Sequence, residues 1–356
     1  MNILQLPPQR TLGRVHVPAV TLAHGGGGKA MKDLIDDVFV SAFCDAQALD
    51  VLEDQARLDL AALARYGDRL AFTTDSFVVD PLFFAGGDIG KLAVCGTIND
   101  LAVGGAKPLY LSCAVVIEEG MPLEKLRKIA RSMAETARLA GVRIVTGDTK
   151  VVERNACDKL FITTTGVGVI PAGIDLGIHR INPGDGILVN GLLGDHGAAI
   201  LAARGDLALE TQVASDCAAL HELIDAVLQA ASGTRCIRDA TRGGIATVLN
   251  EMAEASGLAI EIDEAATPLR EEVRGFCEIL GLDPLYLANE GKAVFAVPPT
   301  EIKAALAAMR AHPLGAGAAL IGHAGAGERG RVTMQTVFGG KRIVDMLVGE
   351  QLPRIC

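Results

Sequence analysis

Apolar and polar positions along this chain show two kinds of pattern, one typical of strands and one typical of helices. Short runs rich in β-branched and apolar residues, such as 110–117 and 160–170, predict strands. Segments with an apolar residue at every third or fourth position predict helices, most clearly 122–140, which begins at a proline and is followed by Gly141. In the first half we expect further strands at 70–74 and 142–146, and further helices after the glycine run 25–28 and at 88–103.

The same mixture of predicted strands and helices recurs after a segment rich in proline and glycine, 170–186. This segment predicts a domain boundary. Both halves mix strands and helices at short spacing, so the fold class is α/β or α+β, and the pattern alone leaves these two open. The elements expected in the second half are strands at 187–190, 258–262, 293–297 and 319–321, and helices at 195–203, 215–230, 243–256, 269–280 and 300–311.

The two ends of the chain differ from the rest. Residues 1–20 contain three prolines and little periodicity, and we interpret them as an arm or a short strand. Residues 339–356 begin at a pair of glycines and end in Pro-Arg-Ile-Cys, which predicts a flexible tail with a hinge at Gly339-Gly340. The expected organisation is an arm (1–20), an N-terminal domain (21–170), a C-terminal domain (171–338) and a tail (339–356).

Composition narrows the function classes. Half of the 356 residues are apolar, which is ample for a buried core and excludes a disordered chain. The net charge of −10 disfavours a protein that binds nucleic acid, and an aromatic content of 4% without tryptophan disfavours a platform for stacked bases. Because no apolar run approaches the ~18–20 residues of a membrane span and no leader pattern opens the chain, we expect a cytoplasmic protein.

The eight cysteines show no C-x-x-C spacing, so a structural zinc site is not expected. In a reducing cytosol most of them are best explained as small core residues. Cys356 is different because it is the last residue, and a thiol on a flexible tail can visit a distant pocket. The alternative is an incidental terminal residue.

A glycine run, Gly25, Gly26, Gly27 and Gly28, leads into the first predicted helix. Glycines allow backbone N–H groups to approach a phosphate, and the N-terminus of a helix favours anions. The run matches neither the Walker A pattern nor the dinucleotide fingerprint. It therefore indicates either a phosphate-binding loop of another kind or a flexible loop.

Acidic residues stand at what we expect to be the ends of strands and helices: Asp75, Asp100 beside Asn99, and Asp148. Carboxylates of this kind suit Mg²⁺, which prefers oxygen ligands and often shares them with substrate phosphates. Lys150 can offset phosphate charge or act as a base. Each acid taken singly is better explained as a cap or turn residue, but three beside a glycine run favour a nucleotide with Mg²⁺.

Two further motifs occur in the second half. Asp239 to Gly244 precedes a predicted helix, and Arg242 within it can hold a phosphate. Asn289 to Lys292 precedes a predicted strand, and Glu290 within it can serve as a base or an electrostatic partner. The alternative for the first motif is a helix cap followed by a tight turn.

Taken together, and in this order along nearly the whole chain, these segments resemble the HypE family of hydrogenase maturation proteins, within the PurM-like (aminoimidazole ribonucleotide synthetase-like) superfamily. The terminal Pro-Arg-Ile-Cys is the most specific of them. The resemblance implies two domains and a flexible C-terminal tail. It implies an α/β N-terminal domain whose strands form a barrel with a second subunit, and an α+β C-terminal domain. ATP would bind between the domains, near the interface of a homodimer.

The resemblance also implies a reaction. A partner, HypF, transfers a carbamoyl group to the terminal cysteine, and the family dehydrates this group to a thiocyanate with ATP. The cyano group then passes to iron held by a HypC–HypD complex, for the assembly of [NiFe]-hydrogenase. On this basis Cys356 carries the substrate, and Lys150 and Glu290 are candidates for proton removal or charge support.

The cofactor sites follow from the same resemblance. Asp75, Asp100 and Asp148 would hold Mg²⁺, and Asn99 would lie near the nucleotide or the metal. The glycine run 25–28 would cradle phosphate and Arg242 would steady it.

Two other kinds of function remain open at this stage. One is a different PurM-like ATP-dependent enzyme, such as a selenophosphate synthetase or a small-molecule kinase of the thiamine-phosphate type. Selenophosphate synthetases usually carry a reactive residue in the glycine-rich segment, where this chain has no cysteine nearer than Cys44. The other is a non-catalytic carrier or scaffold whose tail docks to partners. A dinucleotide-dependent oxidoreductase lacks the required fingerprint.

Overall fold

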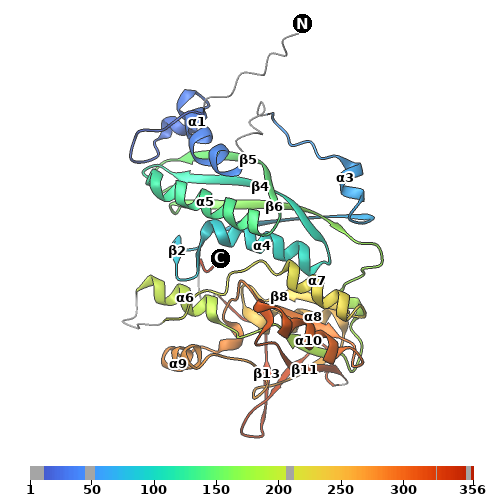
Figure 1. Cartoon of the computed structure of the whole chain (residues 1–356). Helices are drawn as coiled ribbons and strands as arrows, with labels where there is room; N and C mark the ends of the chain where they lie inside the picture. The colour runs from blue at the N-terminus through green and yellow to red at the C-terminus, as the bar shows by residue number, and fades with distance from the viewer. Residues whose placement is uncertain (1–11, 45–52, 206–211, 326, 350–353) are drawn as a thin grey trace.

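The computed structural model describes residues 12–44, 53–205, 212–325, 327–349 and 354–356. Its strands form a four-stranded sheet in the N-terminal half, a seven-stranded sheet in the C-terminal half and one two-stranded ribbon. The halves lie one above the other in Figure 1, and the C-terminal residue lies between them. The expected mixture of strands and helices in both halves is confirmed.

The N-terminal sheet has the strand order β1-β6-β4-β5, with β4 and β5 parallel and the other neighbours antiparallel. Its strands are β1 (Arg69–Phe77), β4 (Lys107–Glu118), β5 (Arg143–Val152) and β6 (Leu160–Ile170). Buried and partly exposed residues alternate along β4 and β6, because one face packs on helices. Side chains on the other face stay at least partly exposed, including Leu70 at 60% and Phe72 at 74%. We call this second surface the open face.

Two long helices, α4 (Ile89–Val103) and α5 (Leu123–Leu139), pack against the N-terminal sheet. α4 begins at Asp88, whose carboxylate accepts hydrogen bonds from the N–H groups of Gly90 and Lys91. It is buried on nearly all sides because it also contacts α7 and β8 of the C-terminal half. The remaining elements of this half are η1 (Leu22–Gly25), α1 (Lys29–Leu34), the π-helical η2 (Ile35–Val40), α2 (Ser41–Phe43), α3 (Leu60–Ala64), β2 (Phe83–Phe84) and β3 (Gly87–Asp88).

The C-terminal sheet has the order β13-β12-β9-β11-β7-β10-β8. Its strands are β7 (Gly186–Val189), β8 (Cys236–Asp239), β9 (Ala259–Asp263), β10 (Ala293–Val297), β11 (Ala319–Gly325), β12 (Val332–Gln335) and β13 (Lys341–Val344). The helical elements are η3 (Ile178–Arg180), α6 (Asp195–Arg204), α7 (His221–Ala230), α8 (Gly244–Ser256), α9 (Glu271–Leu280), η4 (Pro284–Tyr286), α10 (Ile302–Ala311) and η5 (Pro313–Gly315).

Helices cover both faces of this sheet. α8 packs with one set of strand residues, whereas α7 and α10 pack with the alternate set. All five residues of β10 are therefore buried, which explains why this strand is a continuous apolar run. None of the helices in the described part of the chain combines the length and apolar character that crossing a membrane requires.

Most expected elements are present, and the strands 160–170 and 293–297 coincide with β6 and β10. The helix expected at 215–230 begins only at His221. The short strands β8, β12 and β13 were not predicted. β8 has only four residues, two of them charged, and it depends on pairing with β10.

The tail does not begin where the sequence indicated. Gly339 and Gly340 lie in the turn of a hairpin, and residues 341–344 pair with β12 as the edge strand β13. The hinge predicted at these glycines is therefore wrong, because the chain returns into the sheet after them. At the other end, residues 1–11 of the predicted arm lie outside the described residues, and Ala19 forms an isolated bridge with Pro122.

Candidate functional site

The last three residues of the chain are held between the two halves. The N–H of Val78 donates to a backbone carboxylate oxygen of Cys356 at 3.2 Å, and the N–H of Asp80 donates to the Arg354 oxygen at 3.2 Å. His196, on α6 of the other half, bonds through Nε2 to the Ile355 oxygen at 2.8 Å. Ile355 is only 2% exposed and Cys356 only 9%. The candidate cysteine thus lies inside the molecule.

Arg242 faces the sulfur of Cys356. Its Nη2 lies 3.2 Å from Sγ, which places a guanidinium beside the thiol. Arg242 follows β8 and precedes two glycines with positive φ, Gly243 at 79° and Gly244 at 60°. A Cβ atom on Gly244 would stand 2.3 Å from the Leu285 carbonyl oxygen, so only glycine allows this turn into α8.

Burial raises the pKa of the Cys356 thiol to about 12, and the negative charge of Glu290 adds to this shift. Arg242 opposes it without reversing it. The docked thiol is therefore protonated at neutral pH and is a poor nucleophile. Desolvation of the thiol therefore outweighs the favourable charge of the neighbouring guanidinium.

Glu290 is buried beside this thiol at 3% exposure. Burial raises its pKa well above the ordinary value, and the charge of Asp216 contributes next. Among the described residues its Oε1 atom has no hydrogen-bond partner, so a polar group brought to the site can be recognised by it. Burial therefore favours the protonated form of this side chain, which can donate a hydrogen bond.

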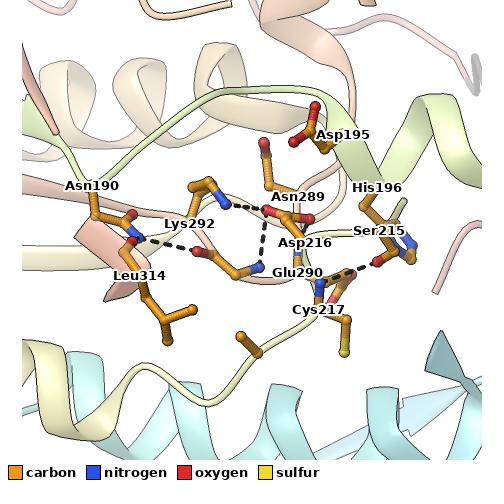
Figure 2. Close-up of polar contacts among 12 residues, drawn as sticks. Asn190, Asp195, His196, Ser215, Asp216, Cys217, Asn289, Glu290, Lys292 and Leu314 are labelled. Atoms are coloured by element: carbon orange, nitrogen blue, oxygen red, sulfur yellow. Dashed lines mark hydrogen bonds and ion pairs between the residues drawn. The ribbon is translucent and has the colours of Figure 1, made fainter. Parts of the chain in front are cut away.

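Asp216 fixes the backbone that carries Glu290. Its carboxylate accepts hydrogen bonds from the N–H groups of Glu290 and Gly291 and from Nζ of Lys292 at 2.9 Å (Figure 2). Asn190 holds the same turn from the other side, since its Nδ2 donates to the oxygens of Gly291 and Leu314. Asp216 was not predicted, because no recognisable motif surrounds it in the sequence.

Three carboxylates gather at the edge of this site. Burial raises the pKa of Asp100 to about 7, with the charges of Asp239 and Asp75 adding to the effect. The pKa values of Asp75 and Asp239 are raised as well, mainly by burial. Thr73 Oγ1 donates to Asp100 Oδ2 at 3.0 Å. Mutual repulsion of this kind is what a bound cation relieves.

Asp239 belongs to this group although only Arg242 of its motif was predicted as a functional residue. The signal was its position three residues before Arg242 in the sequence, but β8, which carries it, was not predicted. Among the described residues, no three or more His, Cys, Asp or Glu side chains are already arranged as metal ligands. Two carboxylates with substrate phosphates are nevertheless a common Mg²⁺ set, so these residues fit that ion.

Asn99 makes hydrogen bonds between the two halves. Its Oδ1 accepts from the N–H of Leu220 at 2.8 Å, and its Nδ2 donates to the Ala218 oxygen at 3.0 Å. The side chain is buried and joins α4 to the segment before α7. Its Nδ2 also lies 3.4 Å from the Glu290 oxygen, so Asn99 joins the two halves beside the turn that carries Glu290. Its contact with nucleotide or metal stays a prediction.

The other predicted residues lie elsewhere on the N-terminal half. Asp148 and Lys150 form an ion pair of 2.8 Å, which lowers the pKa of Asp148. They pair with Ala114 and Val116 of β4, on the open face. The glycine run packs beside the same strand, because a Cβ on Gly25 would stand 2.9 Å from Val151 Cβ.

Within one chain, Asp148, Lys150 and the glycine run lie apart from the carboxylates near Cys356. Across the sheet, Asp75 is in register with Thr164, Cys113 and Gly147, so three strand spacings, about 14 Å, separate it from β5. The expectation that the acids stand at the ends of elements is also wrong. Asp75 and Asp148 lie inside β1 and β5, and Asp100 lies inside α4.

Comparisons with known proteins agree with this picture. The family models described as "AIR synthase related protein, N-terminal domain" and "C-terminal domain" match residues 53–170 and 182–335. The chain is 64% identical over 337 residues to "Carbamoyl dehydratase HypE" of Rhodobacter capsulatus, which covers 95% of this chain and 98% of that protein.

Two solved structures are also similar. A hydrogenase maturation protein HypE in complex with ATP has a TM-score of 0.89 and 47% identity, covering 94% of this chain and 99% of its own. A HypE–HypF complex matches with a TM-score of 0.76 and 44% identity, covering 90% of this chain and 100% of the matched one. The chain therefore belongs to the AIR synthase-related family and, within it, to the HypE carbamoyl dehydratases of hydrogenase maturation.

Proposed function

We propose that this chain dehydrates an S-carbamoyl group on Cys356 to a thiocyanate, with conversion of ATP to ADP and phosphate. The observation that carries the proposal is the position of Cys356, buried between the halves with Arg242 Nη2 at 3.2 Å from its sulfur. A carrier whose tail only bound to partner proteins would not need a binding site for the tail inside its own structure. The ATP complex of a related protein supports the same nucleotide here.

The chemistry requires a leaving group better than hydroxide. Attack of the carbamoyl oxygen on the γ-phosphorus of ATP breaks the bond to ADP and gives S–C(=NH)–O–PO₃²⁻ with loss of one nitrogen proton. Loss of the second nitrogen proton, together with cleavage of the C–O bond, then leaves S–C≡N and hydrogen phosphate. Positioning and charge neutralisation supply most of the acceleration in such phosphoryl transfers.

Arg242 and Glu290 flank the group that reacts. The guanidinium of Arg242 neutralises phosphate oxygens and keeps them beside the carbamoyl oxygen. Burial favours the protonated form of Glu290, which donates to the carbamoyl group from the side of its unpartnered Oε1 atom. It accepts a proton only after positive charge has lowered its pKa.

Mg²⁺ would be held by Asp75 and Asp100, with Asp239 beside them. The ion supplies neutralisation of the phosphate charge that develops during transfer. The support is chemical: these carboxylates have raised pKa values because burial and mutual repulsion disfavour their charged forms. A cation removes that penalty and leaves all of them ionised.

A homodimer completes the site in this proposal. Neither β1 nor β5 has a second strand neighbour among the described residues, so the sheet has two free edges and an open face. Two copies can pair β1 of one with β5 of the other, twice, which closes the sheets into a barrel and covers both open faces. This arrangement also buries Leu70 and Phe72, whose exposure is otherwise unfavourable.

The dimer explains how Asp148, Lys150 and the glycine run can take part in a site. Figure 1 shows α1 and β5 at the end of the molecule far from the C-terminus. We therefore do not assign the predicted residues on and near these elements to the site beside Cys356 of their own chain. Pairing across edges brings β5 of one copy to β1 of the other. We therefore assign Asp148, Lys150 and the glycine run 25–28 to the nucleotide held by the second copy.

The partners follow from the relatives and from the state of the thiol. A docked thiol with a pKa of about 12 is protonated, so loading requires the tail to leave its seat and meet a donor. HypF is the proposed donor, because a related HypE forms a complex with HypF. A HypC–HypD complex is the proposed acceptor of the cyano group.

Mass spectrometry of the intact protein tests the proposal. After incubation with HypF, carbamoyl phosphate and ATP, a carbamoyl adduct on Cys356 is expected, followed by loss of the mass of water only when this chain hydrolyses ATP. The control is Cys356→Ala, which should bind ATP but accept no adduct. An unmodified Cys356 beside a HypF that is active on another acceptor would overturn the proposal. An adduct that never loses water would identify a carrier.

A further inference from the structure

The docked tail accepts hydrogen bonds at three successive backbone oxygens, from two directions. Those of Arg354 and Cys356 accept from backbone N–H groups of Asp80 and Val78, in the N-terminal half. The carbonyl between them, that of Ile355, points the other way and meets the His196 ring. This short segment is thus held like an added strand on one side. On the other side two side chains of α6 hold it, because Nη2 of Arg204 also donates to the Arg354 oxygen at 3.0 Å.

His196 is built to be a donor at this position. The ring is fully buried, and burial lowers its pKa, so the neutral form prevails. A carbonyl oxygen can only accept, so Nε2 carries the single ring proton and Nδ1 is bare. The hydroxyl of Ser215, at 2.8 Å from Nδ1, then donates to it while accepting from the N–H of Cys217 at 3.1 Å.

Figure 2 shows Ser215 directed at the His196 ring and, in the same short segment, Asp216 directed at the turn that carries Glu290. Phe84 packs edge-on against the ring at 5.6 Å between centroids. The segment 215–217 therefore fixes the tautomer and orientation of His196 and also holds the Glu290 turn. The same segment thus positions both the residue that binds the tail and the turn that carries Glu290.

The side chains of the tail are recognised as well. Ile355 packs into the N-terminal core cluster together with Ile200, Cys217 and Ala288 of the other half. Arg354 forms ion pairs with Asp80 and Asp158. An apolar pocket and a pair of acids thus accompany the backbone contacts.

We infer that His196, oriented by Ser215, is a positioning residue that docks the tail by its Ile355 carbonyl and so places the Cys356 sulfur beside Arg242. Without this donor the carbonyl would be buried and unpaired, and the docked state would lose population to states with the tail outside. The consequence for dehydration rests on the proposed function. The docking itself does not, and it is tested without ATP or a carbamoyl group.

The test measures how fast iodoacetamide modifies Cys356 in the full-length protein, resolved by peptide mass spectrometry. A docked, protonated thiol reacts only when the tail leaves its seat. His196→Leu is expected to raise the rate at Cys356 by roughly 5- to 10-fold, as the loss of one buried hydrogen bond implies. His196→Gln places an amide N–H near the Nε2 position and should restore most of the protection.

Internal controls separate docking from general loosening. Cys236 and Cys277 are each 2% exposed and lie in hydrophobic clusters that do not include Ile355, so their rates should remain low in both variants. His221→Leu, a matched change on α7 away from the tail, should leave the Cys356 rate unchanged. An unchanged Cys356 rate in His196→Leu overturns the inference, and so does an increase that Cys236 and Cys277 share.

Single-turnover dehydration of the carbamoylated chain gives a second readout. His196→Leu should slow the conversion several-fold while ATP affinity stays within about twofold of wild type, and His196→Gln should recover the rate. A dehydration rate equal to wild type, in a variant whose Cys356 is deprotected, would show that docking by His196 does not position the reacting group.

Discussion

The Nη2 atom of Arg242 lies 3.2 Å from the Sγ atom of Cys356, 114 residues further along the chain. The contact joins the loop before α8 to the end of the tail. It sets a permanent positive charge beside a thiol whose pKa burial raises to about 12. The same charge is available to phosphate oxygens when the sulfur carries a neutral carbamoyl group.

Replacement of this charge tests the contact. Arg242→Gln should slow single-turnover dehydration by about 10²- to 10³-fold, the usual effect of removing one positioned donor at a developing charge. Arg242→Lys should recover part of the rate, because a point charge lacks the paired geometry of the guanidinium. Rapid-quench sampling of the carbamoylated chain measures both, and equal rates in the three proteins would remove Arg242 from the mechanism.

Asp100 makes stability depend on pH. Its pKa is about 7 in the folded chain and about 4 when unfolded, so between these values the folded state binds more protons. Stability contributed by the protonated form is therefore lost as the pH rises from 4 to 7.

Asp100→Asn should remove this loss. We expect a Tm roughly 2–4 °C above wild type at pH 8 and no gain at pH 4.5, measured by calorimetry without Mg²⁺. The same variant should lose Mg²⁺-dependent ATP hydrolysis. A gain in Tm that is the same at both pH values would contradict the shifted pKa.

Asn99 should matter for stability more than for chemistry. Asn99→Ala leaves the N–H of Leu220 and the carbonyl of Ala218 without their partners in the interior. The free energy of unfolding should fall by roughly 1–3 kcal/mol in urea titrations. Gln229→Ala, on the exposed face of α7, is the control and should change it by less than about 0.5 kcal/mol. A normal stability with lost nucleotide binding would restore the role first expected for Asn99.

The dimer can be tested by complementation. Lys150→Ala and Arg242→Ala should each be nearly inactive. If each site takes Lys150 from one copy and Arg242 from the other, a mixture reassembled from equal amounts should recover about a quarter of wild-type activity, since half of the dimers have one intact site. Recovery of no activity in a mixture shown to contain heterodimers would place both residues in one copy.

Several elements and site residues could be predicted from the sequence because the information is local. The alternation in 160–170 and the helical spacing in 122–140 follow from which side chains must face the core, and both elements are present. Arg242, Glu290 and Cys356 were predicted from short motifs, and the structure brings these three together. Asp216 and His196 escaped notice because their importance lies in partners distant in sequence.

The sequence by itself determined the types of residue available, their order and the elements that carry them, because hydrophobic period and turn chemistry act over a few residues. The tertiary structure decided which of them meet. It separated Asp148 and Lys150 from Asp75 by the width of a sheet, turned Gly339-Gly340 into a hairpin and raised the pKa of Cys356 through burial. Burial and charge proximity depend on the whole packing, so no local pattern contains them.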